Sequence, residues 1–243
     1  MANKKLIGTI ILVFLAAGVG GGFIGYYFPE IEGGSFNPTI DGNFSNSDGW
    51  RFADYKFIEY LTLDPDSENT NNYFYVHLTT NYLYILIDFC GDISGDTTDE
   101  WLTVWIDTDN SLTGGLDDLA WNSTSSDAGE QMFCYFPESD TFTDTFKYFT
   151  VSEFNATLNS SKVEIAHGFQ KTINFNTAHR IFEIRINKNT LDNIGVDNFN
   201  IAFLGYGTAA YYNSDFWGAP SNFAEVFYMD SQINEDRYFR CEV

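Results

Sequence analysis

Residues 71–89, NNYFYVHLTTNYLYILIDF, decide the fold because two kinds of side chain alternate along them on both sides of a polar break. Successive side chains of a β-strand point to opposite faces, so the alternation predicts two strands. The aliphatic face carries Phe74, Val76, Leu78, Leu83, Ile85, Ile87 and Phe89, and the other carries Tyr73, Tyr75, His77, Tyr82, Tyr84 and Asp88. With a turn at residues 79–81, the stretch is expected to be a hairpin with an aliphatic core side.

Residues 100–118, EWLTVWIDTDNSLTGGLDD, predict a strand that runs into an acidic loop. If this strand pairs with the hairpin, Trp101 and Trp105 join the tyrosine face. Further strands are predicted at residues 51–63, 132–136, 147–151, 163–169, 181–186, 199–206 and 224–229, with a helical turn at 188–194. Short strands separated by turn signals indicate an all-β fold, a two-sheet antiparallel β-sandwich of the jelly-roll kind.

The composition agrees with one such domain, which is expected to span residues 39–243. Aromatic residues make up 18% of the chain, and this excess favours strands over helices. The formal net charge of -22 disfavours nucleic acid and anionic lipid as partners. An acidic surface suits a solvated exterior and divalent cations.

The N-terminus carries a long apolar segment. Residues 6–28 are almost wholly apolar and uncharged, which predicts a transmembrane helix, and Lys4 and Lys5 place residues 1–5 in the cytoplasm. A linker at 29–38 then leads to an extracellular domain of a single-pass cell-membrane protein. A cleaved signal peptide is the alternative. Glycines spaced four residues apart in the segment leave self-association open.

The order of several motifs resembles a known family. Ile40-Asp41-Gly42 with Trp50 is followed by the hairpin, by Asp99-Glu100 and Ile106-Asp107-Thr108-Asp109, and by Phe182-Glu183-Ile184-Arg185-Ile186. Over about residues 39–230 this order resembles the carbohydrate-binding module family 9-like group of the DOMON-like β-sandwiches. The resemblance implies a sandwich fold. The group that the chain resembles includes sugar-binding and haem-binding members. Asn187 departs from the family, which has proline after the last motif.

The acidic loop is the candidate metal site. Asp107, Asp109 and Ser111 alternate, and Asp117 or Asp118 can complete a shell of oxygen ligands, which is what calcium prefers. Leu112 stands where an EF-hand loop requires glycine, so a solvated acidic turn is the alternative. A calcium ion here would brace the loop rather than perform chemistry.

The tyrosine face is the candidate ligand site. Tryptophan and tyrosine rings stack on the apolar faces of sugars, so Trp101, Trp105, Tyr82 and Tyr84, with Trp217 from a later loop, are expected to bind a glycan or surface polymer. The alternative is that loops cover this face as a second core layer.

Other sites are less defined. Sequons at Asn43, Asn122, Asn155 and Asn159 predict N-glycosylation of an exported domain. Cys90 and Cys134 are expected either to pair or to remain as free buried thiols.

No catalytic motif occurs, and a haem would have to use Met132 or Met229 with one of three scattered histidines. The sequence therefore predicts a non-catalytic, membrane-anchored binding module; a structural cell-envelope protein is the alternative, and a haem-bearing electron carrier a further one.

Overall fold

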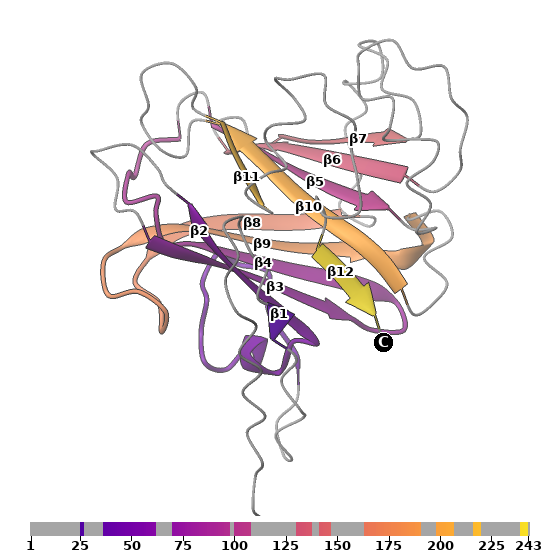
Figure 1. Cartoon of the computed structure of the whole chain (residues 1–243), viewed down its shortest axis with the longest axis horizontal. Coiled ribbons are helices and arrows are strands. Elements are labelled where there is room, and N and C mark those ends of the chain that lie inside the picture. The colour runs from indigo at the N-terminus through magenta and orange to yellow at the C-terminus, as the bar shows by residue number, and fades with distance from the viewer. Residues whose placement is uncertain are drawn as a thin grey trace, which may run out of the picture.

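The computed structural model describes ten stretches of the chain, and all statements on structure refer to them. They are residues 25–26, 36–61, 70–97, 100–107, 130–137, 141–146, 163–190, 198–206, 216–219 and 239–242. Their strands form two antiparallel sheets that lie one above the other (Figure 1). The predicted all-β, two-sheet architecture is therefore confirmed.

The first sheet has six strands and is built around the predicted hairpin. Its order is β1 (Gly25–Tyr26), β2 (Tyr55–Leu61), β3 (Thr70–Leu78), β4 (Tyr82–Phe89), β9 (His179–Asn187) and β8 (Val163–Gln170). Val76 lies opposite Ile85 in the hairpin, and Ile85 lies opposite Ile184 of β9. A sheet neighbour on each side therefore covers both edges of β4.

The second sheet follows the order β11 (Phe216–Ala219), β10 (Asn198–Tyr206), β5 (Trp101–Asp107), β6 (Glu130–Phe136) and β7 (Thr141–Phe146). A further strand, β12 (Phe239–Glu242), also pairs with β10. β11 uses residues 203–206 of β10 and β12 uses residues 198–201, so the two short strands follow one another along the same long one.

The core lies between the sheets, where the aliphatic faces meet. Val76, Ile85 and Ile87 are fully buried from one side, as are Ile106 and Ile201 from the other. Aromatic rings fill the space between these side chains: Phe74 lies 4.9 Å from Phe203, Phe89 4.6 Å from Trp217 and Phe57 4.2 Å from Phe239, centroid to centroid. The alternation in residues 71–89 therefore identified the core face correctly.

Several expectations are corrected. β5 pairs with β6 and β10 in the second sheet, not with the hairpin, so the tryptophans and the hairpin tyrosines belong to different sheets. Residues 51 and 52, the predicted start of a strand, belong instead to a 3₁₀ turn at Trp50–Phe52, which precedes β2. Trp217 lies in strand β11 rather than in a loop. β7, β11 and β12 were not predicted, and the predicted strands at 147–151 and 224–229 lie outside the described residues.

The predicted transmembrane segment is described only at its end. Residues 6–24 and 27–28 lie outside the described residues, whereas Gly25 and Tyr26 form β1, which pairs with Phe57 and Lys56 of β2. These two residues are therefore strand and not helix. Within the ranges given above, no helix is long and apolar enough to cross a membrane.

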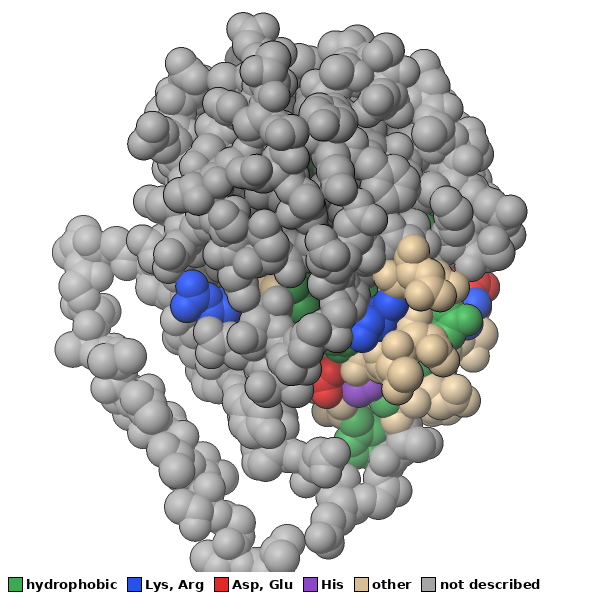
Figure 2. All heavy atoms as spheres, turned by 90° about the vertical axis from the view of Figure 1, so that its right-hand side faces the viewer, with side chains coloured by type: hydrophobic (Ala, Val, Ile, Leu, Met, Phe, Trp, Pro, Cys, Tyr) green, Lys and Arg blue, Asp and Glu red, His purple; other side chains and the backbone are tan. Residues whose placement is uncertain are grey.

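The described surface is mixed in character. Figure 2 shows acidic, basic and histidine side chains beside small apolar areas on one face of the molecule. Among the described residues, the exposed large hydrophobic side chains are Tyr60 of β2, Phe169 of β8 and Ile173 of the loop that follows β8. This pattern is typical of a solvated surface on which single apolar residues are scattered.

Candidate functional site: a pocket on the outer face of the first sheet

The outer face of the first sheet is covered by the segment that precedes β2. Trp50 of this segment is 1% exposed and packs in one cluster with Tyr75, Leu86 and Ile181 of the sheet. Phe36 lies edge-on to Trp50 at 5.2 Å and to Tyr84 at 5.2 Å. The tyrosine face of the hairpin is thus largely a second core layer, which is the alternative that the sequence left open.

A pocket of about 280 Å³ remains where this cover ends. Its wall combines aromatic rings, an aliphatic side chain, amides and two cations. The lining residues are Phe44, Ser45, Asn46, Trp50, Arg51, Ala53, Lys56, Tyr75, Ile173 and Asn174. Its volume lies close to the lower end of the range for small-molecule sites, about 300–1,000 Å³. It is large enough for one small ring rather than for an extended chain.

Three side chains of the lining are held together by hydrogen bonds and ring contacts. Asn174 donates from Nδ2 to the Tyr75 hydroxyl at 2.8 Å, and Lys56 donates from Nζ to Asn174 Oδ1 at 3.4 Å. The Lys56 ammonium also lies 4.7 Å from the centre of the Tyr75 ring and 4.6 Å from that of Tyr73. The cation is thus placed over aromatic faces, where the ring quadrupole attracts it.

Burial shifts the acid–base behaviour of this part of the pocket. Desolvation lowers the pKa of Lys56, against the opposing attraction of the Asp88 carboxylate. Desolvation also raises the pKa of Tyr75 far above its ordinary value, although the bond from Asn174 works in the other direction. Tyr75 therefore remains a neutral hydroxyl, which can donate to a ligand as well as accept from Asn174.

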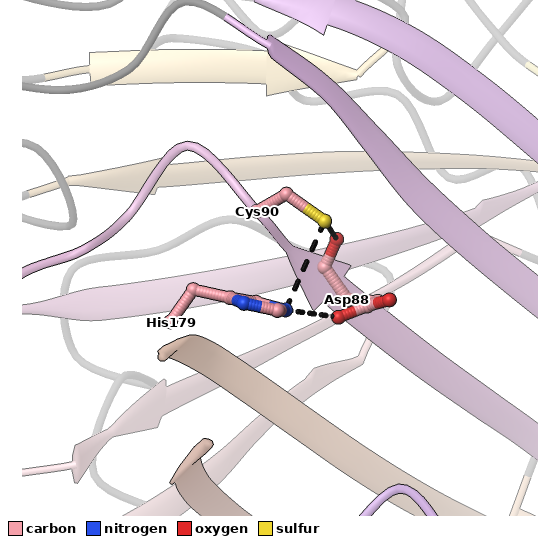
Figure 3. A group of neighbouring side chains, drawn as sticks. All are labelled: Asp88, Cys90 and His179. Carbon is pink, nitrogen blue, oxygen red and sulfur yellow. Dashed lines mark hydrogen bonds and ion pairs between the residues drawn. The ribbon is translucent and has the colours of Figure 1, made fainter. Parts of the chain in front are cut away.

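A buried polar cluster lies directly behind Asn174. Asp88 Oδ2 accepts from Asn174 Nδ2 at 2.6 Å and from the Thr172 hydroxyl at 2.9 Å. Its other oxygen, Oδ1, lies 2.5 Å from His179 Nε2. Cys90 Sγ lies 3.8 Å from the same nitrogen, and Figure 3 shows the three side chains pointing toward one another. The loop at 171–178 is thereby tied to strands β4 and β9.

This cluster is not arranged as a cysteine nucleophile with its base. In such a triad the acid orients the histidine through the nitrogen that does not face the nucleophile. Here Asp88 and Cys90 both face Nε2, and Nδ1 of His179 bonds to the Thr177 carbonyl at 2.7 Å. Burial also raises the pKa of the Cys90 thiol strongly, so the reactive thiolate is disfavoured.

The predicted sugar-binding residues do not come together on one surface. Trp105 is 2% exposed and donates from Nε1 to the Thr103 hydroxyl at 2.8 Å, while Trp217 is 3% exposed in the core beside Phe89. Trp101 is partly exposed and stacks on Tyr206 of β10 at 6.1 Å. Tyr82 and Tyr84 lie together on the other sheet, with their ring centroids 5.9 Å apart. The prediction that these five residues form a single aromatic platform is therefore wrong.

Of the predicted calcium ligands, the structure describes only the backbone of Asp107. Asp107 is the last residue of β5, where its backbone lies opposite Glu130 and Asn200. The other candidate ligands and three of the sequons lie outside the described residues: Asp109, Ser111, Asp117, Asp118, Asn122, Asn155 and Asn159. Asn43 is exposed in a loop, next to Phe44 and Ser45 of the pocket.

Cys90 and Cys241 are free thiols. Cys90 follows β4 in the first sheet and Cys241 lies in β12 of the second, and both are buried. A disulfide between Cys90 and Cys134 is therefore not present, and the alternative of a buried free thiol holds for Cys90.

Of the residues that line the pocket, the sequence pointed to the tyrosine face and Trp50. It did not point to Lys56 and Asn174, because no local pattern marks them.

No family model matches this chain, and no curated protein matches it. Among solved structures, the chain is similar to a carbohydrate binding module family 9 domain from Caldicellulosiruptor kristjanssonii in complex with glucose. The two share 14% sequence identity, with a TM-score of 0.40, over 73% of this chain and 78% of that chain. This solved structure comes from the family that the order of motifs resembles.

Proposed function

We propose that the chain is a carbohydrate-binding module that holds one sugar ring in the pocket between Phe44, Tyr75 and Asn174. The lining carries the proposal, because it combines ring faces with polar groups in one small cavity. Aromatic rings pack against the apolar face of a pyranose, and amides and hydroxyls bond its hydroxyl groups. Tyr75 and Asn174 are already oriented by their mutual hydrogen bond, which lowers the entropic cost of binding.

The charge of the lining points to an acidic sugar. The pocket wall contains Lys56 and Arg51 and no Asp or Glu side chain, although the whole chain has 34 acidic and only 12 basic residues. A carboxylate within reach of Lys56 would be attracted more strongly there than in water, because the site is partly buried. A hexuronic acid is therefore the expected ligand class, ahead of neutral hexoses.

Binding of defined sugars to the full-length chain in detergent micelles tests this proposal. Isothermal titration with neutral hexoses and with the corresponding hexuronates should show saturable binding, tighter for the hexuronate. Phe44→Ala should weaken binding about tenfold or more, because it removes ring contact area. Tyr60→Ala, which removes an aromatic ring 58% exposed outside the pocket lining, is the matched control and should bind normally.

Lys56→Met tests the acidic-sugar preference separately. The long apolar side chain keeps most of the packing and removes the charge, so the hexuronate should lose its advantage over the neutral hexose. Lys188→Met is the control, since Lys188 lies after β9 and does not line the pocket. Binding that persists in Phe44→Ala but is lost in Tyr82→Ala or Trp101→Ala would move the site to the predicted aromatic residues and overturn the pocket assignment.

The proposal also includes the cellular location of the module and a bound calcium ion. The apolar N-terminal segment supports a single-pass membrane anchor, and the sequons support exposure of the sandwich outside the cell. The acidic loop after β5 supports a bound calcium ion that braces it. The burial of Trp105 favours the structural-protein alternative for the outer face of the second sheet, because a covered tryptophan cannot stack on a ligand.

A further inference from the structure

We propose that Asp88, Cys90 and His179 form a binding site for a zinc-type transition-metal ion behind the floor of the pocket. The three side chains present a carboxylate oxygen, a sulfur and an imidazole nitrogen within 4.8 Å of one another. They come from two neighbouring strands and the turn after one of them, and they converge on one point in Figure 3. This site is independent of the proposed sugar-binding function.

The donor set selects the class of ion. Sulfur and imidazole nitrogen are ligands for zinc, cobalt and related ions, whereas calcium and magnesium require oxygen ligands. The site is thus chemically distinct from the acidic loop after β5. Three protein ligands leave one of the four positions of a tetrahedral ion for a small ligand such as water.

The hydrogen bonding around His179 favours an ion at Nε2. The Thr177 carbonyl can only accept, so Nδ1 of His179 must carry a hydrogen and donate it at 2.7 Å. Nε2 then faces a carboxylate oxygen at 2.5 Å, and two acceptors at this distance need a proton or a cation between them. In metal sites, a histidine ligand usually donates its second ring hydrogen to a carbonyl in the same way.

The other two ligands are held as well. Asp88 Oδ2 accepts from Thr172 and Asn174, so Oδ1 is left to face the ion. Cys90 is 1% exposed, and its Sγ lies 3.8 Å from His179 Nε2. Two ligand atoms at zinc bond lengths of about 2.0–2.3 Å lie roughly 3.3–3.6 Å apart in a tetrahedral site. The sulfur–nitrogen gap is therefore close to the required value, and the nitrogen–oxygen gap has to widen by less than an ångström.

Ion entry replaces protons, and the balance can be written. The thiol hydrogen of Cys90 and the proton shared by His179 and Asp88 leave as the ion forms bonds to sulfur, nitrogen and oxygen. Each divalent ion should therefore release about two protons, and nothing is oxidised or reduced. Because protons compete with the ion for these three ligands, binding should tighten as pH rises.

The test uses the full-length chain, stripped with EDTA and titrated with Zn²⁺ and with Co²⁺. We expect one tight equivalent of either ion, a thiolate-to-cobalt charge-transfer band in the near ultraviolet, and a proton release of about two, measured by titration in buffers of different ionisation enthalpy. Ca²⁺ should produce neither the charge-transfer band nor the proton release from this site. The cobalt band is the decisive readout, since exposed carboxylates can bind cobalt but cannot produce it.

Cys90→Ala is the main variant and should abolish the band and the tight equivalent. Cys241→Ala removes another buried free thiol without touching the cluster and should leave both unchanged. Should Cys90→Ala fail to fold, the nearly isosteric Cys90→Ser replaces it, because a hydroxyl group cannot give the thiolate-to-cobalt band. A wild-type chain without the cobalt band, or a band that survives in either variant of Cys90, would overturn the proposal.

Discussion

The carboxylate of Glu183 accepts a hydrogen bond at 2.9 Å from the indole Nε1 of Trp50, which lies 133 residues earlier in the chain. Its second oxygen accepts from the backbone amides of Asp41, at 3.0 Å, and Gly42, at 2.8 Å. One buried side chain of β9 thus fixes the segment that covers the outer face of the first sheet. The same contact explains why the Ile-Asp-Gly motif, Trp50 and the later Phe-Glu-Ile motif occur together.

Replacing Glu183 by glutamine should lower the free energy of unfolding by about 1–3 kcal/mol, because an amide nitrogen then faces at least one buried N–H donor. Trp50→Phe removes one donor of the same network. The two substitutions should be clearly less than additive in the double variant, as measured by urea unfolding. Full additivity would show that the contact is not an energetic link between the segment and the sheet.

Gly42→Ala should destabilise the same connection by more than 1 kcal/mol. Gly42 has φ +75°, and a Cβ there would lie 2.3 Å from the backbone oxygen of His167. Gly95→Ala is the matched control, since a Cβ at Gly95 meets nothing within 4 Å. Equal unfolding midpoints for the two variants in urea would refute the close approach of the segment to β8.

The alternation of side chains was enough to predict the hairpin, the core face and the position of Asp88 on the tyrosine side. It was not enough to predict the sheet to which β5 belongs, because an alternating strand with apolar side chains on one face fits either sheet. β11 and β12 have four residues each, too few to show a period.

The residues of the pocket could not be predicted from the sequence for a different reason. Lys56 and Asn174 meet across 118 residues of sequence, and neither belongs to a motif. Likewise, Cys90 and His179 are 89 residues apart and become neighbours only because β4 pairs with β9. The residue type alone suggested Trp105 and Trp217 as sugar-binding rings. The pattern of β5 does not tell which of its faces is buried, and β11 is too short to show that Trp217 points into the core.

Calcium should raise the melting temperature of the full-length chain if the acidic loop binds it. An ion at 100 times its dissociation constant adds about 2.7 kcal/mol, which corresponds to roughly 5–10 °C for a domain of this size. Asp107→Ala should abolish the shift between EDTA and added calcium. Asp96→Ala, at an exposed acidic residue outside the loop, should retain it. Absence of a shift in the wild type would make the loop a solvated turn.

Stability should fall as pH rises from about 5 to 8, because burial raises the pKa of two carboxylates that face Arg180. Its Nη2 lies 3.2 Å from Glu100 Oε1 and its Nε lies 3.6 Å from Asp92 Oδ2. Burial raises the pKa of Asp92 to about 8 and that of Glu100 to about 7, although Arg180 lowers both. Both values lie above those of the unfolded chain, about 4.

The direction of this pH dependence of stability follows from the number of protons that the folded and unfolded states bind. Between the unfolded and folded pKa values the folded state holds more protons, so the stability that these groups contribute is complete below about pH 4 and is lost as pH rises through about 7 and 8. The loss should approach about 1.4 kcal/mol per pH unit for each proton. Urea unfolding at several pH values measures it. Asp92→Asn should flatten the profile between about pH 6 and 8, whereas Glu164→Gln, at a half-exposed partner of Arg185, should not. An unchanged slope in Asp92→Asn would mean that Asp92 is already ionised in the folded chain.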